Sequence, residues 1–271
     1  RYAEAEPLFI RSLAIREEAL ESKHPDVAQS LNNLAALYST QGRYAEAEPL
    51  YKRSLAIREK VFDPNHPDIA KSLNNLQDLY LKQGRNADAE PIFKRSLVIL
   101  EHSLGFDHPD VATTLNNLAE LYRTQGRFSE AERLYKQTLA IQEKALCANH
   151  PDVATTLNNL ALLHENQGRY EEAESLYKRS LAIREKVLGL NHPDVAKSLN
   201  NLAALCYTQD RYAEAEVLYN RSLAIQEKAL GPKHPDVAAL LANLAALYKK
   251  TGREKEAIKL EERAASIRKN K

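Results

Sequence analysis

A repeat of 42 residues constrains the fold of this chain more strongly than any other feature. The tripeptide His-Pro-Asp recurs at this interval, beginning at His24, His66, His108, His150, His192 and His234. An arginine recurs in the same register, from Arg43 to Arg253. Self-similarity at a period of roughly 20 to 50 residues is typical of solenoids and related arrays, in which each module packs mainly on its neighbours.

Each repeat contains two helical patterns joined by a turn. The first covers about residues 26–41 of the first repeat, where apolar residues recur at the spacing of one helix face: Val27, Leu31, Leu34, Ala35 and Tyr38. Pro25 suits the first turn of this helix, and Gly42 can adopt the left-handed backbone that ends it. The second pattern covers about residues 44–61. Since no strand pattern occurs, the sequence predicts an all-α fold of about 13 helices.

A single helix hairpin cannot bury both of its apolar stripes, but stacked hairpins bury them continuously. We therefore expect one solenoid domain over residues 1–271. Its parts are a half repeat, five full repeats and a last repeat with a polar capping helix: 1–23, 24–65, 66–107, 108–149, 150–191, 192–233 and 234–271. Because the chain starts inside a repeat and without Met, we expect it to be part of a longer protein.

The repeated words carry a family resemblance. The pattern resembles the tetratricopeptide repeat in its small, aromatic and turn positions: Ala35, Tyr38, Gly42, Tyr44, Ala47 and Tyr51. The period is longer than the usual length of about 34 residues, and the words LNNLA, QGRYxEAExLYKRSLAIREK and LGxxHPDVA are similar to kinesin light chains and their bacterial relatives. The resemblance covers essentially the whole chain. It implies a right-handed superhelical solenoid and an adaptor that binds peptides in a concave groove.

Some repeats depart from this pattern. Gln77 replaces the small alanine, and Asp210 replaces the turn glycine. His164 and Cys206 stand where the other repeats have the tyrosine equivalent to Tyr38. We expect both to be buried in the core in place of that ring.

Asparagine recurs at two neighbouring positions of the first helix: Asn32, Asn33, Asn74, Asn75, Asn116, Asn117, Asn158, Asn159, Asn200, Asn201 and Asn243. Asparagine inside a helix is less favourable than alanine by roughly 0.6 kcal/mol, because its amide competes with the backbone. In superhelices of this type the first helices line the groove, so we expect these amides to face it, with the Asn32 position nearest its centre. One hypothesis is that they bind the backbone of an extended peptide. The other is that they tie adjacent helices together without any ligand.

Specificity would come from positions along the groove that vary between repeats. Besides the asparagines, the candidate groove residues are Lys71, Arg123, Lys197, Tyr207 and Lys249. Their cations could attract a partner with acidic residues, although Asp78, Glu120 and Glu165 would oppose this in the middle of the groove. The alternative is an ordinary solvated surface.

Composition argues against several other functions. With 38 Lys and Arg against 37 Asp and Glu, no excess of positive charge favours nucleic acid or an anionic membrane. No glycine-rich phosphate loop occurs. The histidines of successive repeats would lie on the order of 10 Å apart, too far to share a metal ion. We therefore expect no cofactor, no metal site and no enzymatic activity.

Two cysteines do not form a disulfide framework, so a reducing, cytoplasmic location is expected. The sequence predicts a non-catalytic scaffold that binds an extended peptide segment and is a monomer or weakly self-associating. One alternative is an intramolecular sensor or self-associating arm of a larger signalling protein. A more distant one is a single-strand RNA reader, which the near-constant asparagines disfavour because such proteins vary the side chains that read each base.

Overall fold

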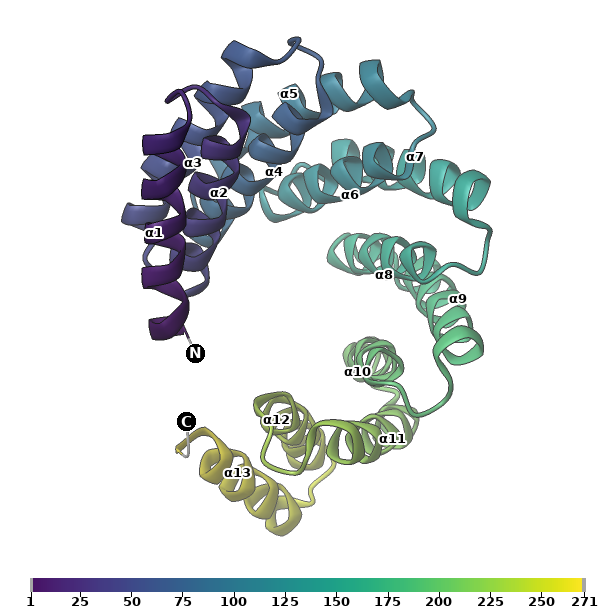
Figure 1. Ribbon diagram of the computed structural model, residues 1–271. Coiled ribbons are helices and arrows are strands. Elements are labelled where there is room, and N and C mark those ends of the chain that lie inside the picture. The colour runs from purple at the N-terminus through teal and green to yellow at the C-terminus, as the bar shows by residue number, and fades with distance from the viewer. Residues whose placement is uncertain (1, 270–271) are drawn as a thin grey trace. The chain divides into compact units, whose positions relative to one another are not determined.

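The computed structural model describes residues 2–269, and all regular elements in that range are α-helices (Figure 1). The first helices of the repeats are α2 (Pro25–Thr40), α4 (Pro67–Lys82), α6 (Pro109–Thr124), α8 (Pro151–Asn166), α10 (Pro193–Thr208) and α12 (Pro235–Lys250). The other helices are α1 (Tyr2–Ala19), α3 (Tyr44–Val61), α5 (Asn86–Leu104), α7 (Phe128–Leu146), α9 (Tyr170–Leu188), α11 (Tyr212–Leu230) and α13 (Glu254–Lys269). The predicted all-α fold is confirmed, and the first helices begin and end one residue earlier than expected.

The His-Pro-Asp tripeptide starts each first helix. In the first repeat, the His24 imidazole Nδ1 accepts a hydrogen bond from the backbone N–H of Asp26 at 3.1 Å. The same bond recurs in the other five repeats. It satisfies one of the backbone donors that every helix N-terminus leaves unpaired. These histidines therefore act as caps at the start of the first helices.

Residue contacts divide the chain into two compact units, the first ending at Arg127 and the second beginning at Phe128. In the first unit, α2 pairs with α3 and α4 with α5, while α3 packs on α4 and α5 on α6. In the second unit, α8 pairs with α9, α10 with α11 and α12 with α13, and α9 and α11 pack on the next hairpin. Consecutive hairpins therefore stack within each unit, as predicted for a tetratricopeptide solenoid.

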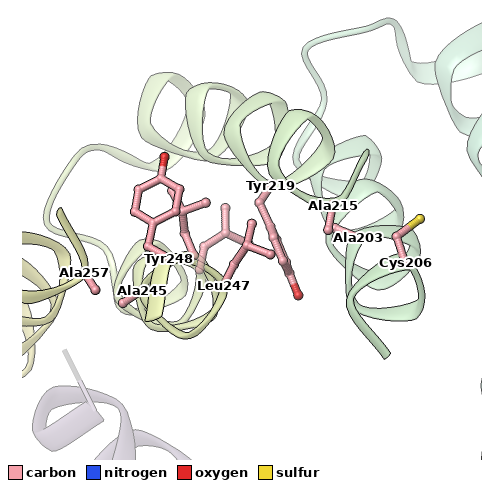
Figure 2. Close-up of a cluster of buried hydrophobic side chains, with 10 residues drawn as sticks. Ala203, Cys206, Ala215, Tyr219, Ala245, Leu247, Tyr248 and Ala257 are labelled. Atoms are coloured by element: carbon pink, nitrogen blue, oxygen red, sulfur yellow. The ribbon is translucent and has the colours of Figure 1, made fainter. Parts of the chain in front are cut away.

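Alternation of small and large buried side chains sets the spacing of the helices. In the cluster formed by α10 to α13, Ala203, Ala215 and Ala257 are fully buried beside the rings of Tyr219 and Tyr248 (Figure 2). Alanine lets two helix backbones approach closely, and the tyrosine rings fill the wider gaps between them. The small and aromatic residues of the repeat therefore form the packing contacts between helices.

A carboxylate joint connects successive hairpins in both units. Glu48 of α3 forms an ion pair with Arg85 at 2.7 Å and accepts a hydrogen bond from the Tyr80 hydroxyl at 3.1 Å. Arg85 and Tyr80 both belong to the next repeat. Lys52 also pairs with Glu48, with its Nζ 2.7 Å from the carboxylate. This hydrogen bond is the main cause of the lowered pKa of Glu48. The guanidinium also lies over the Tyr80 ring, 4.2 Å from its centroid. Equivalent ion pairs join Glu6 to Arg43, Glu90 to Arg127, Glu132 to Arg169, Glu174 to Arg211 and Glu216 to Arg253.

The two repeats that lack this tyrosine have altered joints. His164 is buried, with its ring nitrogens 3.6 Å from carboxylate oxygens of Glu132 and Glu172, and neither nitrogen has a hydrogen-bond partner. Burial, followed by the nearby Arg169, lowers the pKa of His164. Cys206 is also buried, and it lines a cavity of about 420 Å³ beside Arg211. Both residues occupy the core position expected from the sequence.

Candidate functional site

The candidate site is the side of the first helices that carries the asparagines, called here the amide face. Ten of these side chains are half-buried, and Asn117 is exposed. In the second unit, Figure 1 shows α8, α10 and α12 following one another along one side, with α9 and α11 on the other. The amide face of each unit is thus built from first helices, and its amides are partly accessible to solvent.

Amides of neighbouring repeats bind each other at joints within both units. Asn75 donates to the Oδ1 of Asn32 at 2.7 Å, and Asn201 donates to that of Asn158 at 2.9 Å. Asn243 donates in the same way to Asn200 at 3.0 Å. The first asparagine of one repeat therefore accepts from the second asparagine of the next, and at these joints the amides tie adjacent helices together.

These contacts use only part of the hydrogen-bonding capacity of the amides. An asparagine offers two N–H donors and an oxygen with two lone pairs. In the pair between Asn32 and Asn75, the bond engages one N–H of Asn75 and one lone pair of the Asn32 oxygen. The remaining groups lie on half-buried side chains. Helix bridging and ligand binding are therefore compatible at the same residues.

The joint between α4 and α6 has a different arrangement. Asn74 accepts from the Ser96 hydroxyl at 2.8 Å and from the Gln77 amide at 3.2 Å. Asn117 is the exposed member of the set. The departure coincides with Gln77, which replaces the small alanine and is buried among the helices.

The four candidate groove cations are all bound to carboxylates of this chain. Lys71 pairs with Asp68 at 2.9 Å and Lys197 with Asp194 at 3.0 Å. Arg123 pairs with Glu120 at 2.6 Å, and Lys249 pairs with Glu261 at 2.7 Å. An acidic partner would therefore have to compete with these internal carboxylates.

The aromatic candidate Tyr207 is half-buried near the end of α10. Its ring centroid lies 5.7 Å from that of Tyr212, with the planes tilted by 59°. This geometry is typical of a stabilising aromatic pair. One face of the Tyr207 ring therefore packs on its own chain.

Sequence reasoning missed a set of buried arginines beneath the amide face. Arg58 is 6% exposed and donates to the Asp68 carbonyl and the Ser72 hydroxyl, both at 2.9 Å. Its other terminal nitrogen donates to Gln29 at 2.9 Å, and burial lowers its pKa. Arg184 makes the same contacts with Asp194 and Ser198. Arg16, at the equivalent position of α1, is half-buried and repeats them with Asp26 and Ser30. One sequence pattern could have revealed these contacts, because each of the three arginines precedes a serine by 14 residues.

Two cavities lie at joints where this arginine is replaced. One, of about 220 Å³, is lined by Leu100, Asp110 and Thr114, which correspond to Arg58, Asp68 and Ser72. The other, of about 270 Å³, has Gln226, Asp236 and Leu240 at the same three positions. Both cavities also include asparagines of the amide face among their lining residues.

Within residues 2–269, no three His, Cys, Asp or Glu side chains come together in a way that could hold a metal ion. In the same range, none of the helices is both long enough and apolar enough to cross a bilayer. Both cysteines are free thiols, Cys147 exposed and Cys206 buried.

Comparison with known proteins assigns the chain to a family. A tetratricopeptide-repeat model matches residues 1–60, 27–102, 68–144, 152–228 and 207–270, and a second such model matches residues 116–187. The comparison with curated proteins gave no match.

Several solved structures are similar in fold. BtubC (BKLC) from P. vanneervenii is 25% identical, with 97% of this chain and 91% of that chain covered and a TM-score of 0.67. A putative kinesin light chain from Podosopora anserina with nearly identical TPR-like repeats is 30% identical, with 77% of this chain and 98% of that chain covered and a TM-score of 0.65. The apo form of RapI, at 13% identity and a TM-score of 0.67 over 89% of this chain and 97% of that one, shares the fold. The chain therefore belongs to the tetratricopeptide-repeat family, and it is similar to the kinesin light chain-like proteins within it.

Proposed function

We propose that this chain is a non-catalytic scaffold that binds an extended polypeptide segment along its amide face. The observation that carries the proposal is the amide set itself. Nearly every repeat presents two partly accessible carboxamides, although asparagine is unfavourable inside a helix. Their remaining donors and acceptors match the backbone N–H and C=O groups of an extended chain, whatever its side chains.

Neighbouring side chains would supply selectivity. Because Lys71, Arg123 and Lys197 are already paired with Asp68, Glu120 and Asp194, acidic residues of a partner would displace an existing ion pair and gain little. We therefore expect hydrogen bonding and shape to dominate recognition. Binding should depend weakly on salt concentration, in contrast to binding of a nucleic acid.

The test begins with peptides selected from a random displayed library, labelled and titrated into the whole chain. The variant changes the first asparagine of each repeat to alanine: Asn32→Ala, Asn74→Ala, Asn116→Ala, Asn158→Ala and Asn200→Ala. A matched control changes exposed alanines of second helices to serine: Ala56→Ser, Ala140→Ser, Ala182→Ser and Ala224→Ser. Helicity is monitored in both by circular dichroism.

We expect the asparagine variant to remain helical and to lose at least about tenfold in affinity, since several hydrogen bonds of about 1 kcal/mol each would disappear. The control should bind as the parent does. Unchanged affinity in the asparagine variant would refute a role of these amides in binding. Self-association of the free chain in light scattering, with no selected peptides, would instead favour an array that binds its own copies.

A further inference from the structure

We propose that the cavity at Leu100 is a binding pocket for the guanidinium group of an arginine side chain from a partner polypeptide. The cavity, called here the Leu100 pocket, lies between α4, α5 and α6 in the first unit. The inference rests on the proposed function, since the arginine would belong to a segment lying along the amide face.

The Arg58 side chain of the same chain shows how a guanidinium is bound at an equivalent joint. At the preceding joint, the Arg58 guanidinium is buried and held by three neutral oxygen acceptors, namely the Asp68 carbonyl, the Ser72 hydroxyl and the side chain of Gln29. Arg184 is held in the same way in the second unit. A guanidinium with five N–H donors in a rigid plane suits such a set of acceptors. The repeat is therefore built to bury this group at the joint.

The Leu100 pocket keeps two of the three acceptor positions of the Arg58 site and has leucine in place of the arginine, while Lys71 stands at the position of the third acceptor, Gln29. Leucine is shorter and has no donors, so the space filled by the guanidinium at Arg58 is left as a cavity of about 220 Å³. Asp110 and Thr114, which correspond to the acceptors Asp68 and Ser72, line it. At present the Thr114 hydroxyl donates to the Asp110 carbonyl at 2.9 Å. Rotation of this hydroxyl would offer both oxygens to an entering guanidinium.

A buried acceptor without a partner also points to a donor ligand. Gln77 lines the pocket and is 4% exposed, and its Oε1 has no hydrogen-bond partner in the described structure. Its Nε2 donates to Asn74 at 3.2 Å, which fixes the oxygen as the unused end of the amide. A buried unpaired acceptor destabilises the fold, so a ligand that donates a hydrogen bond to it would recover this penalty.

The surrounding charges are compatible with a cation. Asp78 and Asp110 are also among the lining residues. The one lining lysine, Lys71, is held by Asp68 at 2.9 Å and points an exposed side chain to solvent. The cavity of about 270 Å³ lined by Gln226 allows a comparison with the Leu100 pocket within the same chain. The Oε1 of Gln226 has no hydrogen-bond partner there, but Leu240 stands at the position of Ser72 and Thr114 and offers no hydroxyl acceptor. We expect it to bind a guanidinium more weakly.

The test uses the whole chain with labelled leucine methyl groups and titrates it with N-acetyl-arginine methylamide. The uncharged isostere N-acetyl-citrulline methylamide is the matched control ligand. We expect saturable shifts of the Leu81 and Leu100 methyl signals, which line the pocket, with roughly millimolar affinity for the arginine amide. Because charge-assisted hydrogen bonds are about twice as strong, the citrulline amide should bind about tenfold more weakly.

Two variants test the pocket itself. The double variant Leu100→Arg, Thr114→Ser restores the residues of the Arg58 joint, so its own guanidinium should fill the cavity, abolish binding and leave the unfolding temperature unchanged or higher. Gln77→Ala restores the small residue found at Ala35 and its equivalents, so it should fold normally and bind at least about threefold more weakly.

The proposal is overturned if the arginine amide causes no saturable shifts at these methyls, if it binds the double variant as tightly as the parent, or if citrulline binds equally well. A lower unfolding temperature of the double variant would also contradict it. This assay does not involve the amides of the other repeats. Its failure is therefore distinguishable from failure of the peptide-binding proposal, which would appear only with selected peptides and the asparagine variant.

Discussion

At the scale of single residues, backbone conformation shows where one repeat deviates from the others. Gly105, Gly189 and Gly231 follow the second helices with φ between 83° and 88° and ψ between 154° and 158°. This region is accessible almost only to glycine. Cys147 occupies the same position in its repeat with φ of 79°. The side chain at Cys147 therefore imposes strain on a turn that glycine forms without strain in three other repeats.

Replacing this residue should relieve the strain. We expect Cys147→Gly to raise the free energy of unfolding by about 1 kcal/mol, measured by urea denaturation. The reverse change in an equivalent turn, Gly189→Cys, should lower it by about as much. A decrease for Cys147→Gly would show that the turn tolerates the side chain and that the strain argument is wrong.

The buried imidazole of His164 gives a pH-dependent prediction. Burial lowers its pKa below the ordinary value of 6.5, so it stays neutral in the folded chain at a pH where the unfolded chain takes up a proton. The folded state therefore loses stability as the pH falls below about 6.5. His164→Tyr should remove this loss and restore the hydroxyl contact to Glu132, so its gain in melting temperature over the parent should be larger at pH 5.5 than at pH 7.5.

The exposed His102 provides the control. His102→Tyr removes an imidazole of the same kind outside the core, so it should leave the pH dependence of melting unchanged. A gain for His164→Tyr that is identical at both pH values would mean that burial of the imidazole is not the cause.

At the scale of helices, the carboxylate joint makes each hairpin depend on its neighbour. The clearest case is Glu174, where Arg211 and then Lys178 lower the pKa to about 2 from the ordinary value of 4.5. A carboxyl with a lowered pKa stabilises the fold above about pH 4.5, and this contribution is lost as the pH falls towards 2. The ion pair is only partly shielded from solvent, which limits its strength.

We expect Glu174→Gln to lower the free energy of unfolding by about 1 kcal/mol at pH 7, with the difference from the parent shrinking below pH 4.5 and vanishing near pH 2. Urea denaturation across this range measures it. Glu171→Gln, at an exposed position of the same helix, is the control and should change little. A constant difference at all pH values would exclude ionisation of Glu174 as its origin.

The helices and their turns could be predicted from the sequence because proline, glycine and the apolar stripe each act locally. The bounds of α3, Tyr44–Val61, agreed with the expectation. Bridging by the amides was one of two hypotheses that the sequence left open, and neither the partners of each amide nor the cavity at Leu100 could be predicted in the same way. The bond between Asn32 and Asn75 spans 43 residues, and the cavity depends on whether the side chain at 100 reaches the first turn of α6. Such contacts depend on the distance between helices, which residue periodicity alone does not specify.

At the scale of the whole molecule, stability should be distributed over repeats and the contacts between neighbours. Deleting residues 150–191 joins Asn149 to His192 in register and brings Arg211 to the position that Arg169 occupies beside Glu132. We expect this shortened chain to keep the parent's ellipticity per residue in circular dichroism. Its urea transition should have a lower midpoint and a smaller slope, because less surface is exposed on unfolding.

The shortened chain should fold only if the deletion keeps the repeats in register. A deletion of residues 150–187 removes almost as much chain, but at the new junction it places no carboxylate opposite an arginine and no asparagine opposite its partner. This control should lose ellipticity or aggregate. If both deletions behave alike, the joints between repeats contribute little to the fold.

Contacts that recur at the joints connect residues separated by constant intervals, such as 37 for the carboxylate and its arginine and 43 for the bridged amides. In the gene, unequal crossing-over between two copies of the repeat inserts or removes a whole module and creates a junction that the protein already uses elsewhere. We therefore expect the reach of this protein along a target to evolve by changes in copy number. Selectivity can follow through point differences between repeats, such as leucine at position 100 where another repeat has Arg58.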